Sequence, residues 1–347
     1  MSTAPTRPAG PPRLALRREW VLAAIILAIA LAVGLRAPVF LTLRNALDIA
    51  NDSAILAILV MGQMLVLLTR GVDLSVASNL ALAGMLVALL GKAVPALPLP
   101  VLIAAALAIG AALGWLNGWL ITRFLLPSIV VTLGTMSVYR GAIFVASGGA
   151  WVNDQDVHPL IKALPRDTLA GLPMLVWAAL AVIAFSLWLL RWRREGRELY
   201  AYGGNPHAAL YAGIPVRQRL VLAYTLSGAL AGLAGLLWVG RYAIAFTELA
   251  SGFELTVIAA CVIGGVSIGG GVGTVGGALL GVLFIGVVNA ALPVIQVSPF
   301  WQQAIAGAVI LVSVALNARS QRSAGRQILE PQERTAAPAT PAHGAAA

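Results

Sequence analysis

Few side chains in this sequence could carry out acid–base, nucleophilic or metal chemistry. The three histidines, two of which are His158 and His207, lie outside the apolar runs, and no metal-ligand spacing joins them. Cys261 is the only cysteine and lies inside an apolar run, which excludes an internal disulfide and a cysteine-rich metal site. The sequence contains no GxxxxGK[ST] phosphate-binding loop. We therefore expect no catalytic residue, metal or cofactor, and any ATP must be hydrolysed by another chain.

A few polar side chains interrupt long apolar runs, namely Gln63, Asp73, Thr132, Thr135 and Arg140. Placing a charged group in lipid costs several kcal/mol, so a charge at membrane depth is a candidate functional residue. We expect these five residues to line a substrate pathway, where a neutral polyol needs hydrogen bonds more than charges. A structural alternative stays open, because Asp73 could cap the following helix and Arg140 could pair with an acidic residue.

The composition is that of an integral membrane protein. Hydrophobic residues make up 60% of the chain and charged residues 10%, and the mean hydropathy is +0.90. The apolar segments are continuous and do not alternate, which excludes a transmembrane barrel. We predict an all-α membrane domain over residues 20–318, between disordered cytoplasmic tails at residues 1–19 and 319–347.

Ten transmembrane helices are expected in this domain, since each needs about 20 apolar residues. We place them at residues 20–35, 46–69, 72–90, 99–121, 127–147, 172–190, 220–239, 254–268, 272–295 and 300–316. The eighth is short, and whether residues 254–271 cross completely is left open.

The distribution of basic residues predicts the orientation. With both termini in the cytoplasm, the inner segments hold 16 lysines and arginines: four before the first span, Arg70, Arg123, six in residues 191–219 and four in the tail. The outer segments hold six. Because cytoplasmic loops are enriched in Lys and Arg, this bias supports the assigned orientation.

Glycines at helical spacing predict close helix packing. They are Gly110, Gly114 and Gly118, then Gly228 and Gly232, then Gly277 and Gly281. The lone GxGxxG of Gly271, Gly273 and Gly276 opens a membrane helix and has no preceding strand, so it does not indicate a nucleotide site. The basic residues are not interleaved with aromatics, and we expect no nucleic-acid partner.

The longest polar interval, residues 191–219, is expected to hold a short helix below the membrane. Asn205-Pro206 reads as a turn that starts the helix, Ala208 and Ala209 are helix formers, and Gly213 stops it. Such an element suggests docking to a soluble partner. An ordinary connecting loop is the alternative.

Four segments resemble the transmembrane subunits of ribose-type sugar importers of the ATP-binding cassette class. They are LTRGVDLSVAS (68–78), VTLGTMSVYRG (131–141), YAYGGNPHAALYAGI (200–214) and GFELTVIAACVIGGVSIGGGVGTVGGALLG (252–281). Within that family, YRGAIFVASGGAWV and SPFWQQAIAGAVIL are most similar to autoinducer 2 importer permeases, and rhamnose and ribose permeases are close. Ala77 departs from the pattern, which usually has glycine there.

The resemblance implies a permease in the bacterial inner membrane, in contact with membrane lipid, that imports a small sugar-like solute. Its implied partners are a second permease subunit, identical or paralogous, a periplasmic solute-binding protein and two ATPase subunits. The helix at Asn205, Pro206, Ala208, Ala209, Gly213 and Ile214 would be the coupling helix, and its small residues would pack against the ATPase. An ion-coupled secondary transporter is the alternative, but it needs intramembrane ionisable residues, which are scarce here. No catalytic constellation supports a membrane enzyme.

Overall fold

The computed structural model describes residues 13–294, 298, 301, 304 and 307–308. Helices dominate these residues, and the only β-ladder among them is the two-stranded antiparallel pair β1–β2. The elements are α1 (Arg13–Arg36), the 3-10 helix η1 (Pro38–Leu41), α2 (Leu43–Leu68), α3 (Val76–Ala93), α4 (Leu99–Phe124), α5 (Ser128–Ser147), α6 (Pro159–Arg166), β1 (Thr168–Leu169), β2 (Leu172–Pro173), α7 (Met174–Trp192), α8 (Arg194–Gly204), α9 (Pro206–Tyr211), α10 (Val216–Tyr242), α11 (Phe253–Ile263) and α12 (Val275–Val294).

The long helices follow from the continuous apolar runs. In lipid every backbone polar group must be satisfied within its own segment, which an α-helix achieves. Eight helices within the described residues are long and apolar enough to cross a membrane: α1, α2, α3, α4, α5, α7, α10 and α12. The prediction of an all-α integral membrane protein is confirmed. Most of the tenth predicted span, 300–316, lies outside the described residues, and so do both predicted tails except residues 13–19, which belong to helix α1 and differ there from the predicted disorder.

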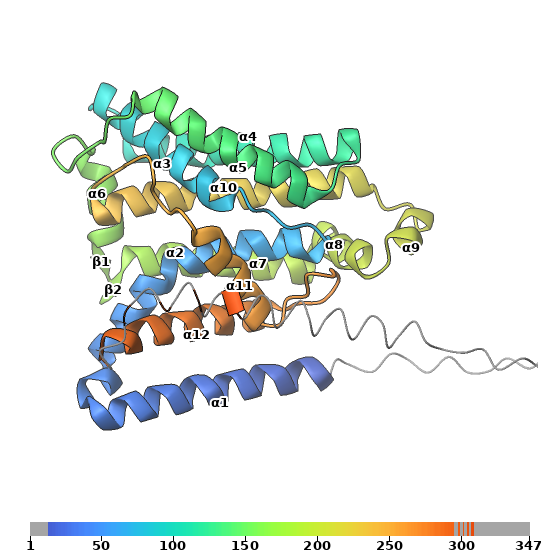
Figure 1. Ribbon diagram of the computed structural model, residues 1–347, viewed down its shortest axis with the longest axis horizontal. Helices are drawn as coiled ribbons and strands as arrows, with labels where there is room; N and C mark the ends of the chain where they lie inside the picture. The colour runs from blue at the N-terminus through green and yellow to red at the C-terminus, as the bar shows by residue number, and fades with distance from the viewer. Residues whose placement is uncertain (1–12, 295–297, 299–300, 302–303, 305–306, 309–347) are drawn as a thin grey trace, which may run out of the picture.

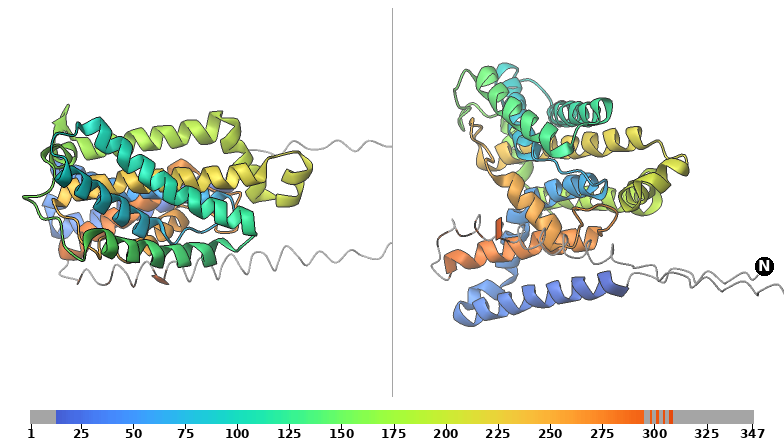
Figure 2. Two further views of the ribbon diagram at one scale, coloured as in Figure 1. Left: turned by 90° about the horizontal axis from the view of Figure 1, so that it is seen from above. Right: turned by 45° about the vertical axis from the view of Figure 1, so that its right-hand side comes forward.

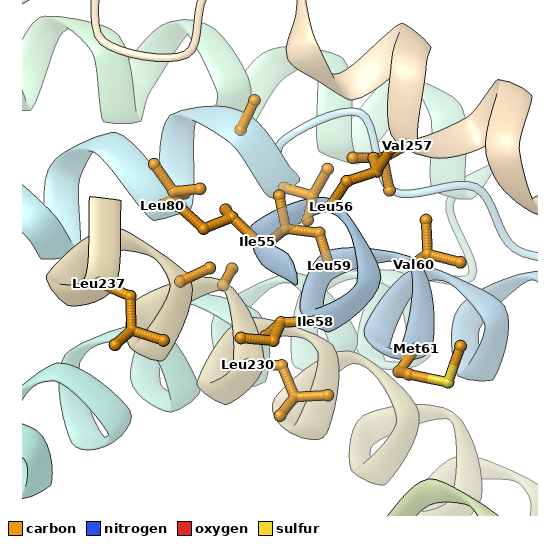
Figure 3. Packing of buried hydrophobic residues seen from close by; sticks show 14 of the residues in the cluster. Ile55, Leu56, Ile58, Leu59, Val60, Met61, Leu80, Leu230, Leu237 and Val257 are labelled. Atoms are coloured by element: carbon orange, nitrogen blue, oxygen red, sulfur yellow. The ribbon is translucent and has the colours of Figure 1, made fainter. Parts of the chain in front are cut away.

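Helix α2 lies at the centre of the bundle. Its residues from Ser53 to Leu68 are all buried, because α10, α12, α7 and α11 surround it. Figure 3 shows its aliphatic side chains interleaved with those of α3, α10 and α11; the labelled examples include Ile55, Leu59, Leu80, Leu230 and Val257. A helix that is apolar on every side is a buried one, so the core is organised around α2.

The predicted glycine faces are confirmed as close contacts. Helices α4 and α10 cross with Gly114 against Gly228, and a Cβ added to Gly114 would lie 2.9 Å from the Gly228 Cα. Helices α11 and α12 approach each other where Gly277 faces Gly264. Small residues let backbones come this close, which is how helices associate when there is no water to exclude.

The connecting segments gather at two opposite ends of the bundle (Figures 1 and 2). At the α6 end, the Lys92 ammonium pairs with Asp156 at 3.0 Å and Val152 N–H donates to the Ala245 carbonyl at 2.9 Å. At the α9 end, Gly271 N–H donates to the Leu68 carbonyl at 3.0 Å. The α6 end holds loops predicted to be outside, and the α9 end holds loops predicted to be inside. Which end faces the cytoplasm stays a prediction.

The eighth predicted span differs from expectation. Helix α11 has only 11 residues, or about 16 Å at 1.5 Å per residue, which is too short to span a bilayer. The preceding residues 243–252 are not a regular helix, and Gly252 has a left-handed φ of 79°. These residues run from the α6 end of the bundle to the start of α11, which lies partway along the bundle (Figure 1). The crossing is thus completed by a non-helical half followed by a helical half.

Candidate functional site

The turn between α2 and α3, residues 69–75, holds Asp73. One carboxylate oxygen of Asp73 accepts hydrogen bonds from the Ser75 backbone N–H at 2.9 Å and from the Ser75 hydroxyl at 2.7 Å. Ser75 is the N-cap residue of α3, and Asp73 itself is only 1% exposed. This is close to the alternative in which Asp73 caps the following helix, because its carboxylate binds the N-cap residue of α3.

Two other side chains hold the backbone of the same turn. The Gln63 amide, oriented to satisfy both partners, donates to the Asp73 carbonyl and accepts from the Asp73 N–H, each at 3.2 Å. The Thr132 hydroxyl on α5 accepts from Leu74 N–H at 3.1 Å and donates to the Ser128 carbonyl at 2.9 Å. Gln63, Asp73 and Thr132, which are far apart in the sequence, meet here.

The polar network continues into α4 and α5. The Asn117 amide donates to the Ser75 hydroxyl at 2.8 Å, and the Tyr139 hydroxyl donates to the Leu113 carbonyl at 2.8 Å. The Thr135 hydroxyl lies on the same helix as Tyr139 and donates to the Thr132 carbonyl at 3.3 Å. Four helices are therefore joined through one buried polar cluster, in which each member has a hydrogen-bond partner.

The electrostatics of Asp73 are unusual for a carboxylate. Burial raises the pKa of Asp73 above its ordinary value, while the two hydrogen bonds from Ser75 lower it by less. None of the salt bridges formed by the described residues includes Asp73. The turn thus contains a buried acid stabilised by hydrogen bonds alone, and burying an unpaired charge is costly.

Arg140 lies on α5, apart from this cluster, and contacts the non-helical half of the broken crossing. One guanidinium nitrogen donates to the carbonyls of Leu249 at 2.7 Å and Thr247 at 3.3 Å. The acidic residues Glu248 and Glu254 interact electrostatically with Arg140, but its hydrogen-bonded partners are backbone carbonyls. An irregular segment at membrane depth leaves carbonyls without helical partners, and Arg140 supplies donors for two of them.

The predicted short helix is present as α9, at the far end of the bundle (Figure 2). The Asn205 side chain caps it by accepting from Ala208 N–H at 3.1 Å, and Pro206 occupies its first turn. Gly213 follows it with a left-handed φ of 74°, and Ile214 N–H donates back to the Ala209 carbonyl at 3.1 Å. Both helix signals read from the sequence are confirmed.

Residues 45–314 match the model of a family described as the permease component of branched-chain amino acid transport systems. The chain belongs to this permease family. It is 35% identical over 289 residues to the autoinducer 2 import system permease protein LsrC of Enterobacter sp. (strain 638), covering 83% of each chain. It is 36% identical over 308 residues to the LsrC protein of Klebsiella pneumoniae subsp. pneumoniae, covering 88% of each. No solved structure gives a significant match.

These relationships, together with the eight candidate spans, identify the chain as a multi-pass permease component of an importer in the bacterial inner membrane. Importers of the ATP-binding cassette class combine such a permease with ATPase and solute-binding subunits. The pathway role of Gln63, Asp73, Thr132, Thr135 and Arg140 stays a prediction. In this conformation their polar atoms are engaged mainly by the permease's own backbone.

On α9 the exposed surface of the permease differs from expectation. Ala209 is 3% exposed, so it packs within the chain itself and is not available to a partner as placed here. The exposed positions include Leu210 at 58% and Tyr211 at 93%. Of the small residues named from the sequence, Ala208 and Gly213 are exposed, but these two large side chains were missed. The signal in the sequence is that two large apolar side chains stand within the polar interval 191–219.

Helix α8 was also missed. Glu198 accepts from Arg194 at 2.6 Å and from Arg219, which lies at the start of α10. Burial alone would raise the pKa of Glu198, but the two arginines outweigh it and hold that pKa below its ordinary value. Asn117 and Tyr139 were missed as well, although Asn117 interrupts an apolar run in the same way as Gln63.

Proposed function

We propose that the chain is the permease subunit of an ATP-driven importer of autoinducer 2, with ATP hydrolysed on a separate subunit. Two permease subunits would form the pathway, a periplasmic binding protein would deliver the solute, and α9 would dock to the ATPase. The relatives named above support autoinducer 2 over rhamnose or ribose, because both are autoinducer 2 permeases and cover more than four-fifths of this chain.

The observation that carries the docking role is the exposed apolar surface of α9. Leu210 and Tyr211 are exposed residues of α9, and this helix protrudes at one end of the bundle beyond the long helices (Figure 1). A helix this short would not be stable by itself in water. Its Asn205 cap and the Gly213 stop hold it in place, and its two large apolar side chains, Leu210 and Tyr211, remain uncovered. Aromatic residues exposed in this way are typical anchors of protein interfaces.

The docking role predicts an effect of charge on α9. Tyr211→Asp should leave the permease in the membrane at its normal level, since this residue has little contact with the rest of the chain. It should lower co-purification of the ATPase and uptake of autoinducer 2 by about tenfold or more, because an interface anchor contributes 2 kcal/mol or more. The measurement is ATPase retained per permease, followed by uptake in proteoliposomes.

The matched control is Gln218→Asp, which adds the same charge to an exposed position in the first turn of α10. It should leave both quantities unchanged. If Tyr211→Asp retains the ATPase and transports as well as the control, α9 is an ordinary connection and the docking role is wrong.

A further inference from the structure

The C-terminal end of α8, which leads directly into α9, is bound by Arg70. The Arg70 guanidinium donates through Nε to the Gly203 carbonyl at 2.7 Å and through Nη2 to the Gly204 carbonyl at 3.0 Å. These are terminal carbonyls of α8, which lack partners within the helix. Asn205, the N-cap of α9, is the next residue. Arg70 thus holds the joint between α8 and the docking helix.

A glycine loop between α11 and α12 closes the same junction. Gly271 N–H donates to the Leu68 carbonyl at the end of α2 at 3.0 Å, and the Tyr200 hydroxyl on α8 donates to the Gly273 carbonyl at 2.8 Å. A Cβ added to Gly271 would lie 2.5 Å from the Gly204 nitrogen. Three segments therefore meet backbone to backbone: the end of α2, the end of α8 and the loop before α12.

Each segment at this junction leads to a different part of the permease. Arg70 is three residues from Asp73 and has a left-handed φ of 64°, so its backbone is fixed within the turn that anchors the buried polar cluster. The glycine loop follows α11, which is the helical half of the broken crossing. The junction therefore connects the α8–α9 joint both to the α2–α3 turn and to the loop that follows α11.

We propose that Arg70 is the positioning residue that transmits movement of α9 to the α2–α3 turn and to α11. The inference rests on the proposed docking of α9 to an ATPase. The planar guanidinium spans two successive carbonyls, which the single ammonium of a lysine cannot do in the same geometry. The contact thus transmits both the position and the orientation of the α8–α9 joint, and it forms a contiguous chain of contacts from the docking helix to the crossing.

The test compares Arg70→Ala, Arg70→Lys and the control Arg123→Ala in the full complex with ATPase and binding protein. Arg123 is an exposed arginine in the last turn of α4 at the same end. Arg70→Ala should retain the ATPase and its basal hydrolysis within about twofold, but lose about tenfold in uptake of autoinducer 2 and in hydrolysis stimulated by the loaded binding protein. Arg70→Lys should be intermediate, and Arg123→Ala should match the wild type.

Two results would overturn the proposal. In the first, Arg70→Ala is stimulated and transports like Arg123→Ala. In the second, Arg70→Ala loses the ATPase on purification, which would make Arg70 part of docking and not of transmission. If Arg70→Ala does not accumulate in the membrane, the Arg70→Lys variant is the test. A ratio of stimulated to basal ATP hydrolysis in Arg70→Lys equal to that of the wild type would then count against the proposal. A wild-type permease that never retains the ATPase would instead contradict the docking function.

Discussion

Asp73 combines full burial with a role as hydrogen-bond acceptor, and these two properties have opposite effects on its charge. Its pKa is above the ordinary value of 3.8 in the folded permease. The folded state therefore binds the proton more tightly than the unfolded state, and stability falls as pH rises from 3.8 through the folded pKa. Ionisation of Asp73 therefore lowers the stability of the fold, although its oxygen supports the α2–α3 turn.

This predicts different outcomes for two substitutions. Asp73→Asn keeps an oxygen for the Ser75 N–H and removes the charge, so we expect it to be at least as stable as the wild type at about pH 8 and to depend less on pH down to about pH 5. Asp73→Ala leaves the Ser75 donors unpaired and should lose roughly 1–3 kcal/mol. Melting temperatures of the detergent-solubilised permease measure both. A wild type more stable than Asp73→Asn at the higher pH would show that the charge is stabilising.

At this scale the sequence predicted which residues belong together but not what they bind. Gln63, Asp73 and Thr132 stood out because polar groups are rare in apolar runs, and the structure brings them to one turn. Their partners are mainly backbone atoms of that turn, which no side-chain pattern reveals. Arg140 shows the same limit, because the carbonyls of Thr247 and Leu249 become acceptors only where the helix is interrupted.

Some glycines in the membrane helices are required for close packing against a neighbouring helix, and others are not. On α4, a Cβ at Gly114 would lie 2.9 Å from the Gly228 Cα of α10, whereas on α5 a Cβ at Gly134 meets nothing within 4 Å. Gly114→Ala should therefore push the two helices apart and cost about 1–3 kcal/mol, as overpacking does.

The matched substitution Gly134→Ala should be neutral or stabilise by up to about 1 kcal/mol, because alanine favours the helix over glycine. Thermal unfolding of the solubilised subunit measures both effects. Equal melting temperatures for the two variants would contradict the close α4–α10 contact.

Element boundaries were predictable where composition alone decides them. The eight long helices follow from continuous apolar runs, and α9 follows from its cap and its stop. Two elements depend on distant partners. The segment before α11 is bound by Arg140 of α5, and α8 is supported by the Glu198–Arg219 pair with α10. Local sequence contains neither of these contacts.

For the whole molecule, the two ends separate the loops as the charge bias predicts, so the orientation can be tested with one label at each end. In a Cys261→Ser background, we expect Gln155→Cys at the α6 end to react with an impermeant thiol reagent in intact cells, and His207→Cys at the α9 end to react only after lysis. Both positions are exposed. Reaction of both cysteines, or the opposite order, would reject the predicted orientation.

The interrupted crossing formed by residues 243–252 and α11 also constrains how the permease is assembled during synthesis. A long apolar helix can enter the bilayer as it is made, because its backbone hydrogen bonds are already complete. The 11-residue α11 is too short for this, and the carbonyls of Thr247 and Leu249 find their donor on α5. Helix α5 precedes this segment in the chain, so Arg140 is synthesised before residues 243–252. Because of this order, the hydrogen-bond donor for the Thr247 and Leu249 carbonyls exists before residues 243–252 are made and enter the bilayer.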